Sequence, residues 1–242
     1  VVLITSNRGL CGSFNSNIIR KTSAQLKDPK NISRQRTEMG DMEASEEVEI
    51  DVIGIGKKGA DFAKKNNYNL IASYSEFSDT PKLDAIMPIS QMIIDEYTKG
   101  NYDKVVVAYT DFKSAIAQVA KFRQVLPVSE TDIEKMIGEL GSDKDAKDKE
   151  NEEKKEIADY VFEPSKSEVL ETILPRLVET QVYQAVLESS ASEHSARMMA
   201  MRNASDAAED MIKELNLTFN KARQAAITQE IAEIAGGAAA LE

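Results

Sequence analysis

The sequence predicts an α/β fold: a Rossmann-like, mostly parallel sheet with flanking helices, plus a long projecting C-terminal α-helix. Two observations support this prediction. Over residues 1–164, short β-branched runs alternate with helical patterns, which is typical of a parallel sheet with helices on its faces. Over residues 165–242, strong helix formers dominate, with no proline after Pro175 and no glycine before Gly236. We therefore expect an α/β globular domain over 1–164 and a long helix over 165–242.

The first part begins with a β-branched run, Val1–Thr5, that predicts a buried strand, and Ser13 can cap the helix that follows. Further strands are expected at Val48–Ile53, Tyr68–Tyr74, Tyr102–Thr110 and Gln118–Pro127, and further helices near Ala60–Asn66 and over Leu83–Lys99. Pro88 should lie near the first turn of its helix, because a proline deeper inside removes a backbone hydrogen bond. The last two strands follow one another directly, so they should form an antiparallel hairpin at one sheet edge.

The long helix is expected from about Ser167 to Ile234, after a capping box formed by Ser165 and Glu168. At 1.5 Å per residue it would be about 100 Å long. A globular part of this size has a diameter of only about 40 Å. A continuous helix must therefore project from the domain, or else break.

Small and apolar residues recur along this helix in alternating steps of three and four, which is the pattern of a coiled-coil seam. The seam comprises Met201, Ala204, Ala208, Met211, Leu215, Thr218, Ala222 and Ala225. An apolar stripe is expected to continue it, slightly rotated, through Ile227, Ile231, Ile234, Ala238 and Leu241. Two partners for the seam remain open: a second copy of the chain, or a helix upstream of Val1. The chain starts inside a strand and without Met, which indicates an internal cut.

The formal charge of −11 comes from two acidic stretches, residues 38–51 with −7 and residues 130–159 with −6. They overlap two segments that we interpret as insertions, near 28–47 and 138–156. The rest of the chain is close to neutral, so the charge does not argue against an anionic partner. The single cysteine, Cys11, excludes an intramolecular disulfide, and the single histidine, His194, removes most histidine-based metal clusters. No run approaches about 18 apolar residues, so we expect no direct membrane insertion.

The stretch Gly54–Gly59 matches G-x-G-x-x-G between a strand and a helix, with Glu76 near the end of the next strand. This is the layout of a dinucleotide fingerprint, in which glycines allow close approach and the helix N-terminus binds the pyrophosphate. A dinucleotide-binding α/β enzyme that uses Gly54, Gly56 and Gly59 is therefore an alternative function. The competing interpretation is a structural turn, because no catalytic group accompanies the glycines.

Three further features have both a structural and a functional interpretation. Cys11 is either part of a tight turn or a thiolate activated at a helix N-terminus. His194 is expected on a helix surface or between helices, rather than in a catalytic site. The cluster Asn220–Gln224 is either a solvated face or a site for an acidic partner, because the planar fork of arginine suits carboxylates.

Four stretches, taken together and in this order, resemble the gamma subunit of the rotary, proton-translocating ATP synthases. They are Ser6–Gly12 with Phe14 and Asn15, Ala191–Met201, Asn220–Ala225, and the spaced residues Ile227, Thr228, Glu230, Glu233, Gly237, Ala238 and Ala240. The resemblance covers the whole chain except the two acidic stretches. This chain lacks the family's long N-terminal helix. The long helix here would therefore be half of an antiparallel coiled coil whose N-terminal helix is absent.

The resemblance implies a central-stalk rotor that couples proton-driven rotation to conformational change in the catalytic subunits, and that is not catalytic by itself. It implies as partners the catalytic and non-catalytic subunits, the epsilon subunit and the membrane c-ring. It implies no cofactor, no metal and no nucleic acid. The implied location is peripheral, on the cytoplasmic face of the bacterial inner membrane.

The resemblance also implies partner-binding residues. Arg223 and Gln224 match the residues that hydrogen-bond an acidic loop of a catalytic subunit, and Thr228 and Glu233 on the same helix are further candidates. Arg197 matches a position that contacts the lower rim of the subunit ring.

Overall fold

The computed structural model describes residues 1–27, 48–75, 80–128 and 166–239. Their elements are β1 (Val2–Ile4), α1 (Phe14–Leu26), β2 (Asp51–Ile55), α3 (Lys57–Lys65), β3 (Asn69–Tyr74), α4 (Leu83–Thr98), β4 (Val105–Phe112), β5 (Gln118–Leu126) and α6 (Lys166–Ala239). The acidic stretches near 28–47 and 138–156, and the Ser165 of the expected capping box, lie outside the described residues.

One five-stranded sheet has the order β3-β2-β1-β4-β5, in which the first four strands are parallel and β5 runs antiparallel to β4. Leu3 lies at the centre, paired with Gly54 on one side and with Ala108 on the other. The predicted α/β class with a hairpin at one edge is confirmed. The strand order reverses between β1 and β4, so the carboxyl ends of these strands border the crevice where open α/β sheets commonly bind ligands.

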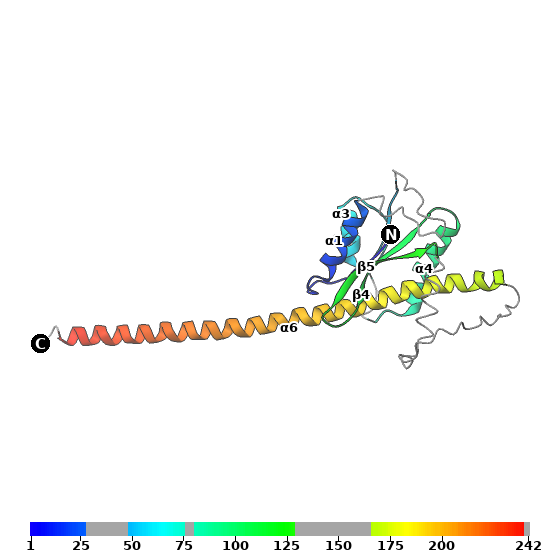
Figure 1. Ribbon diagram of the computed structural model, residues 1–242. Helices are drawn as coiled ribbons and strands as arrows, with labels where there is room; N and C mark the ends of the chain where they lie inside the picture. The colour runs from blue at the N-terminus through cyan, green and yellow to red at the C-terminus, as the bar shows by residue number, and fades with distance from the viewer. Residues whose placement is uncertain (28–47, 76–79, 129–165, 240–242) are drawn as a thin grey trace, which may run out of the picture.

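Helices cover both faces of the sheet, as the alternation of strands and helices predicts (Figure 1). Ile18 of α1 and Ala63 of α3 pack with Leu3, Val52 and Ala108 on one face. The larger core lies on the other face, between the sheet, α4 and α6, and its fully buried members are Ile86, Ile89, Val107, Val125, Val178 and Val182.

Several predicted boundaries shift because strand pairing extends past local turn signals. Strand β2 runs on to Ile55, which pairs with Ile4, and α3 therefore begins directly afterwards, at Lys57. Strand β4 runs to Phe112, where it pairs with Gln118 of β5.

One local expectation for a helix start was wrong, and a second is confirmed in position only. Pro88 is the sixth residue of α4, one turn deeper than expected. The helix tolerates it because the missing N–H would have bonded the carbonyl of Asp84, an exposed residue of the first turn. Ser13 occupies the N-cap of α1 but makes no capping hydrogen bond, and its Oγ instead accepts one from Asn17 Nδ2 at 3.2 Å.

Helix α6 is continuous over 74 residues and runs through Pro175 without ending. At 1.5 Å per residue its length is about 110 Å. Its N-terminal part lies along the sheet, where Val178, Val182, Ala185, Ser189 and Ser192 form a buried stripe. From Met201 to Gly237 every residue is exposed, and Figure 1 shows this part extending well beyond the sheet. The helix therefore projects rather than breaks.

Candidate functional site

The glycine turn between β2 and α3 is filled by the end of β1. Gly56 has a φ of +92°, and a Cβ added to it would lie 2.1 Å from the carbonyl oxygen of Thr5. A Cβ on Gly59 would lie 2.9 Å from Thr5 Oγ1. Both glycines are therefore required for packing against a neighbouring strand of the same chain.

The first amides of α3 are also occupied. The N–H of Lys57 donates to Asn7 Oδ1 at 3.0 Å, that of Lys58 to the Ser6 carbonyl at 3.2 Å, and that of Gly59 to Thr5 Oγ1 at 2.7 Å. A dinucleotide fingerprint uses such amides to bind the pyrophosphate. Here the chain itself accepts them, which favours the structural-turn interpretation over the dinucleotide-binding enzyme. Glu76, the acidic residue of the motif, lies outside the described residues.

Cys11 is part of a hydrogen-bonded loop after β1. It is 2% exposed, and its Sγ accepts a hydrogen bond from Asn15 Nδ2 at 3.2 Å. The same Asn15 amide donates to Ser6 Oγ at 2.6 Å, and Ser6 Oγ donates to the carbonyl of Arg8 at 2.5 Å. The buried, bonded sulfur supports the structural interpretation of the turn.

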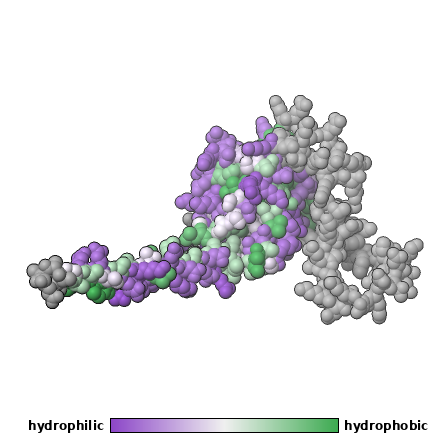
Figure 2. Space-filling view, turned by 60° about the vertical axis from the view of Figure 1, so that its left-hand side comes forward, coloured by the Kyte–Doolittle hydropathy of each residue, from purple (hydrophilic) through white to green (hydrophobic). Residues whose placement is uncertain are grey.

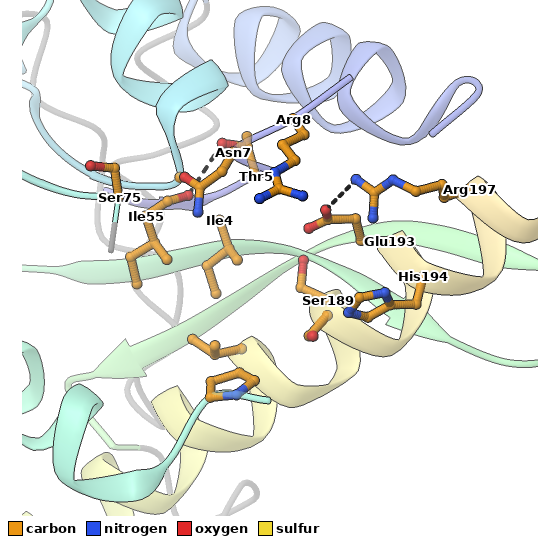
Figure 3. A pocket seen from close by; sticks show the side chains of 14 residues that line it. Ile4, Thr5, Asn7, Arg8, Ile55, Ser75, Ser189, Glu193, His194 and Arg197 are labelled. Carbon is orange, nitrogen blue, oxygen red and sulfur yellow. Dashed lines mark hydrogen bonds and ion pairs between the residues drawn. The ribbon is translucent and has the colours of Figure 1, made fainter. Parts of the chain in front are cut away.

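A cavity of about 460 Å³ lies between this loop, the carboxyl ends of β1 and β2, and α6. Figure 3 shows Arg8 from the loop and Glu193, His194 and Arg197 from α6 around it. Arg197 donates to Glu193 Oε1 at 2.6 Å, and this ion pair is partly shielded, with side chains 26% and 21% exposed. Arg197, a predicted partner-binding residue, therefore lies at the base of the projecting helix. Arg8 was not among the predicted site residues, although it stands in a recognised motif.

The coiled-coil seam continues from the projecting helix into this cavity. Counting back from Met201 in the same steps of four and three gives Arg197, His194 and Ser190, and all three line the cavity. At about 100° per residue, this line lies about 130° round the helix from the stripe that packs on the sheet. A partner helix on the seam could thus run down to the α/β part without displacing it.

The other predicted site residues lie far up the same helix. Arg223 is 26 residues beyond Arg197, or about 39 Å at 1.5 Å per residue. Arg223 and Gln224 are exposed and lie on the faces turned away from the seam residues Ala222 and Ala225. The structure therefore separates Arg197 from the upper group and forms no single site from them.

The side chains of the two remaining candidates, Thr228 and Glu233, are hydrogen-bonded to other residues of α6. Thr228 Oγ1 donates to the carbonyl of Gln224 at 2.9 Å, and Glu233 Oε1 accepts from Gln229 Nε2 at 2.9 Å. Both residues are exposed on α6. Their polar groups are accessible, but each would have to share or exchange its present bond to contact a partner.

The apolar stripe near the tip was expected to continue the seam with a slight rotation, but it does not. On the continuous helix Ile227, Ile231 and Ile234 share the face of Arg223, and at about 100° per residue this face is more than a third of a turn from the seam. Their exposed fractions are 43%, 62% and 74%. The projecting helix thus has two separate apolar faces, and Figure 2 shows apolar patches between polar ones along it.

A sheet domain fixed to a helix whose far half is exposed defines a stalk-like protein. No helix among the described ranges is long and apolar enough to cross a membrane. Within those ranges no three His, Cys, Asp or Glu side chains gather as metal ligands would.

Comparison with known proteins gives one consistent family. The family model described as ATP synthase matches residues 1–241. The ATP synthase gamma chain of Chloroflexus aurantiacus is 39% identical over 241 residues, which is 100% of this chain and 72% of that one. The gamma chain of Herpetosiphon aurantiacus is 41% identical over 246 residues, with the same two coverages.

Solved structures agree on the fold. The mitochondrial ATP synthase of Euglena gracilis, in an OSCP/F1/c-ring structure, contains a chain that matches with a TM-score of 0.63 and 21% identity, covering 99% of this chain and 71% of that one. The central stalk and c-ring of the Tetrahymena thermophila enzyme contain one with a TM-score of 0.53 and 25% identity, covering 84% and 75%. The chain belongs to the ATP synthase gamma-chain family, and its assignment as a central-stalk subunit of ATP synthase is confirmed.

Proposed function

We propose that this central-stalk subunit acts as a rotor shaft and is not catalytic by itself. The bare part of α6 lies inside the ring of catalytic and non-catalytic subunits, and the α/β part is held by the epsilon subunit and the c-ring. The location is peripheral, on the cytoplasmic face of a bacterial inner membrane. The observation that carries this proposal is the continuous exposure of α6 from Met201 to Gly237.

The two apolar faces of that helix suit two kinds of contact. The seam, rich in alanine, lets a second helix approach closely and stiffen the shaft. The face with Ile227, Ile231 and Ile234 remains on the outside of such a pair, where it can touch the surrounding subunits. Burying one isoleucine side chain contributes about 1.5–3 kcal/mol, so this face supplies enough energy to hold the tip in a bearing.

Rotation can be converted into chemistry because the faces of the shaft differ. Polar and apolar side chains alternate around α6, so each orientation presents a different surface to each catalytic subunit. A shaft that stabilises one nucleotide state more than another shifts its population by the difference in contact energy. A difference of about 1.4 kcal/mol changes the affinity tenfold.

Arg223 and Gln224 are proposed as the polar contact to an acidic loop of a catalytic subunit. Both lie on the outer faces of the shaft, so a partner helix on the seam leaves them accessible. A guanidinium hydrogen-bonded to a carboxylate is typically worth about 1.5–3 kcal/mol. Thr228, Glu233 and Arg197 are proposed as further contacts along the same path.

The test is Arg223→Ala in the assembled ATP synthase, measured as coupled ATP hydrolysis. Loss of the contact should lower turnover by about tenfold or more, from the energy of a charged hydrogen bond. Lys221→Ala is the matched control, because it removes a cation two positions away from the same exposed helix. Gel filtration should show that the complex with Arg223→Ala assembles normally although its turnover is lower. Equal turnover in wild type and both variants would refute the role of Arg223.

A further inference from the structure

One face of the α/β part carries a concentration of positive charge that the proposed function does not use. Helices α1 and α3 lie side by side on the face of the sheet opposite to α6 (Figure 1). Residues 14–27 and 57–65, which form these helices and the C-cap of α1, contain seven basic side chains and a single acidic one, Asp61. The basic face, as we call it, consists of Arg20, Lys21, Lys27, Lys57, Lys58, Lys64 and Lys65.

The two helices direct these cations away from the sheet. Each helix buries one stripe of residues against the sheet. At about 100° per residue, the sides opposite these stripes are occupied by Arg20 and Lys27 on α1, and by Lys58 and Lys65 on α3. The other three basic residues lie on the flanks, and all seven are exposed. The basic face is therefore turned to the surroundings of the molecule.

Nearby acidic groups do not neutralise this charge. Within the described ranges, no Asp or Glu forms an ion pair with any of the seven basic residues. Lys21 Nζ donates to the carbonyl oxygen of Ala120 at 2.6 Å, which leaves its charge uncompensated. The remaining described residues hold 14 basic and 18 acidic side chains, so the two signs are separated on the molecule. A ligand of the basic face must therefore be anionic.

The composition of the basic face favours a diffuse anionic surface over a protein partner. Six of its seven residues are lysines, which are hydrated point charges on flexible stems and not planar forks. Protein interfaces are poor in lysine and depend on apolar and aromatic anchors. No large hydrophobic side chain is exposed on α1 or α3. Anionic lipid headgroups, by contrast, attract clusters of lysine without any apolar contact.

A nucleic acid is also a poorer fit. Single-stranded nucleic acids are held largely by aromatic side chains on which the bases stack. Phe62 is the only aromatic residue of α3, and it is half-buried against Tyr68. Phe14, the only aromatic residue of α1, is buried. The basic face thus offers charge without a stacking surface.

We propose that the basic face binds anionic phospholipid headgroups and so holds the α/β part at the membrane surface. This rests on the peripheral membrane location proposed above, and it adds the class of lipid and the residues that contact it. Helix α6 stays free to project, because it packs on the opposite face of the sheet. Each lysine near an anionic bilayer strengthens binding about fivefold, so the four outward cations together supply roughly 600-fold.

The test is co-sedimentation of the full chain with vesicles of phosphatidylcholine mixed with phosphatidylglycerol, and with vesicles of phosphatidylcholine alone. A chain with a formal charge of −11 is repelled by an anionic bilayer unless a local excess of cations outweighs the repulsion. We expect binding to the mixed vesicles only. It should be lost at about 0.5 M salt, where the Debye length shrinks to about 4 Å.

Two double variants assign the binding to this face. Lys58→Gln with Lys65→Gln should weaken binding about 30-fold, since each lysine contributes about fivefold. Lys82→Gln with Lys221→Gln is the matched control, because it removes the same charge at exposed positions outside the basic face. The control should bind as the wild type does. Circular dichroism should show that both variants fold, since all four side chains are exposed.

Three outcomes would overturn the proposal. The first is no binding of the wild type to the mixed vesicles, and the second is an equal loss of binding in the two double variants. The third is binding to poly-glutamate or duplex DNA but not to the vesicles, which would assign the face to an acidic protein or a nucleic acid. The Arg223→Ala test in the assembled ATP synthase involves no lipid contact, so failure of this proposal is distinguishable from failure of the proposed function.

Discussion

Replacing Gly56 with alanine tests whether the Gly54–Gly59 stretch is a structural turn or a dinucleotide-binding loop. The added Cβ would lie 2.1 Å from the carbonyl oxygen of Thr5, which is backbone and cannot swing away. The φ of +92° adds a second cost, since side chains with L chirality disfavour it. The conformational strain is worth about 1–3 kcal/mol and the overpacking another 1–3. We expect Gly56→Ala to lower the free energy of unfolding by about 3–5 kcal/mol.

The assay is urea denaturation followed by circular dichroism, with Gly9→Ala as the matched control. Gly9 lies in the neighbouring loop, and a Cβ there meets nothing within 4 Å, so its replacement should change stability by less than about 0.5 kcal/mol. Because typical domains are stable by only about 5–15 kcal/mol, failure of Gly56→Ala to fold at all would also agree with the prediction.

Equilibrium dialysis with labelled NAD and ATP completes this test. The occupied amides of α3 predict no micromolar binding to the wild-type chain. A Gly56→Ala protein as stable as Gly9→Ala would refute the packing argument. Micromolar binding by the wild type that disappears in Gly56→Ala would restore the dinucleotide-binding alternative.

Two further predictions concern α6. Val182 is fully buried against the sheet, so Val182→Ala should cost about 2 kcal/mol in urea unfolding, whereas Met211→Ala, at 63% exposure, should cost less than about 0.5. An unchanged Val182→Ala would mean that the helix does not pack there. The bare seam should make the chain associate with itself as concentration rises in sedimentation velocity, and Leu215→Glu should abolish this, because a charge at a seam position is costly to bury. Association that survives the change would place the contact on another face.

Local patterns were sufficient where the structure depends on periodicity. Alternating β-branched runs predicted the strands, and the hairpin of β4 and β5 followed from two strands with no helix between them. The helix-forming composition after Pro175 predicted α6 and its projection, since its length exceeds any domain of this size. The alternation of side chains along β4 also places Asp111 on the same face as Tyr109. The sequence does not show which helix packs on that face.

The candidate site was predicted in part. Family motifs pointed to Arg197 and to Arg223, and the structure places them about 39 Å apart along one helix, at about 1.5 Å per residue. The role of Arg8 at the cavity was not predicted, because nothing local to the loop shows that α6 passes beside it. The terminal stripe was misplaced because a slightly rotated continuation was assumed, whereas a continuous helix fixes the angle between every pair of residues.

The sequence by itself determined the elements, the long helix and the family, because helix and strand periods are local and four spaced motifs are specific. Only the tertiary structure decided what the glycines of β2 and α3 are for. They admit Thr5, which directly follows β1 some 50 positions earlier, and no local pattern contains that contact. It likewise decided that Asp111, at the end of β4, is nearly buried and lies between the ammonium groups of Lys113 and Lys121, because β5 folds back along β4.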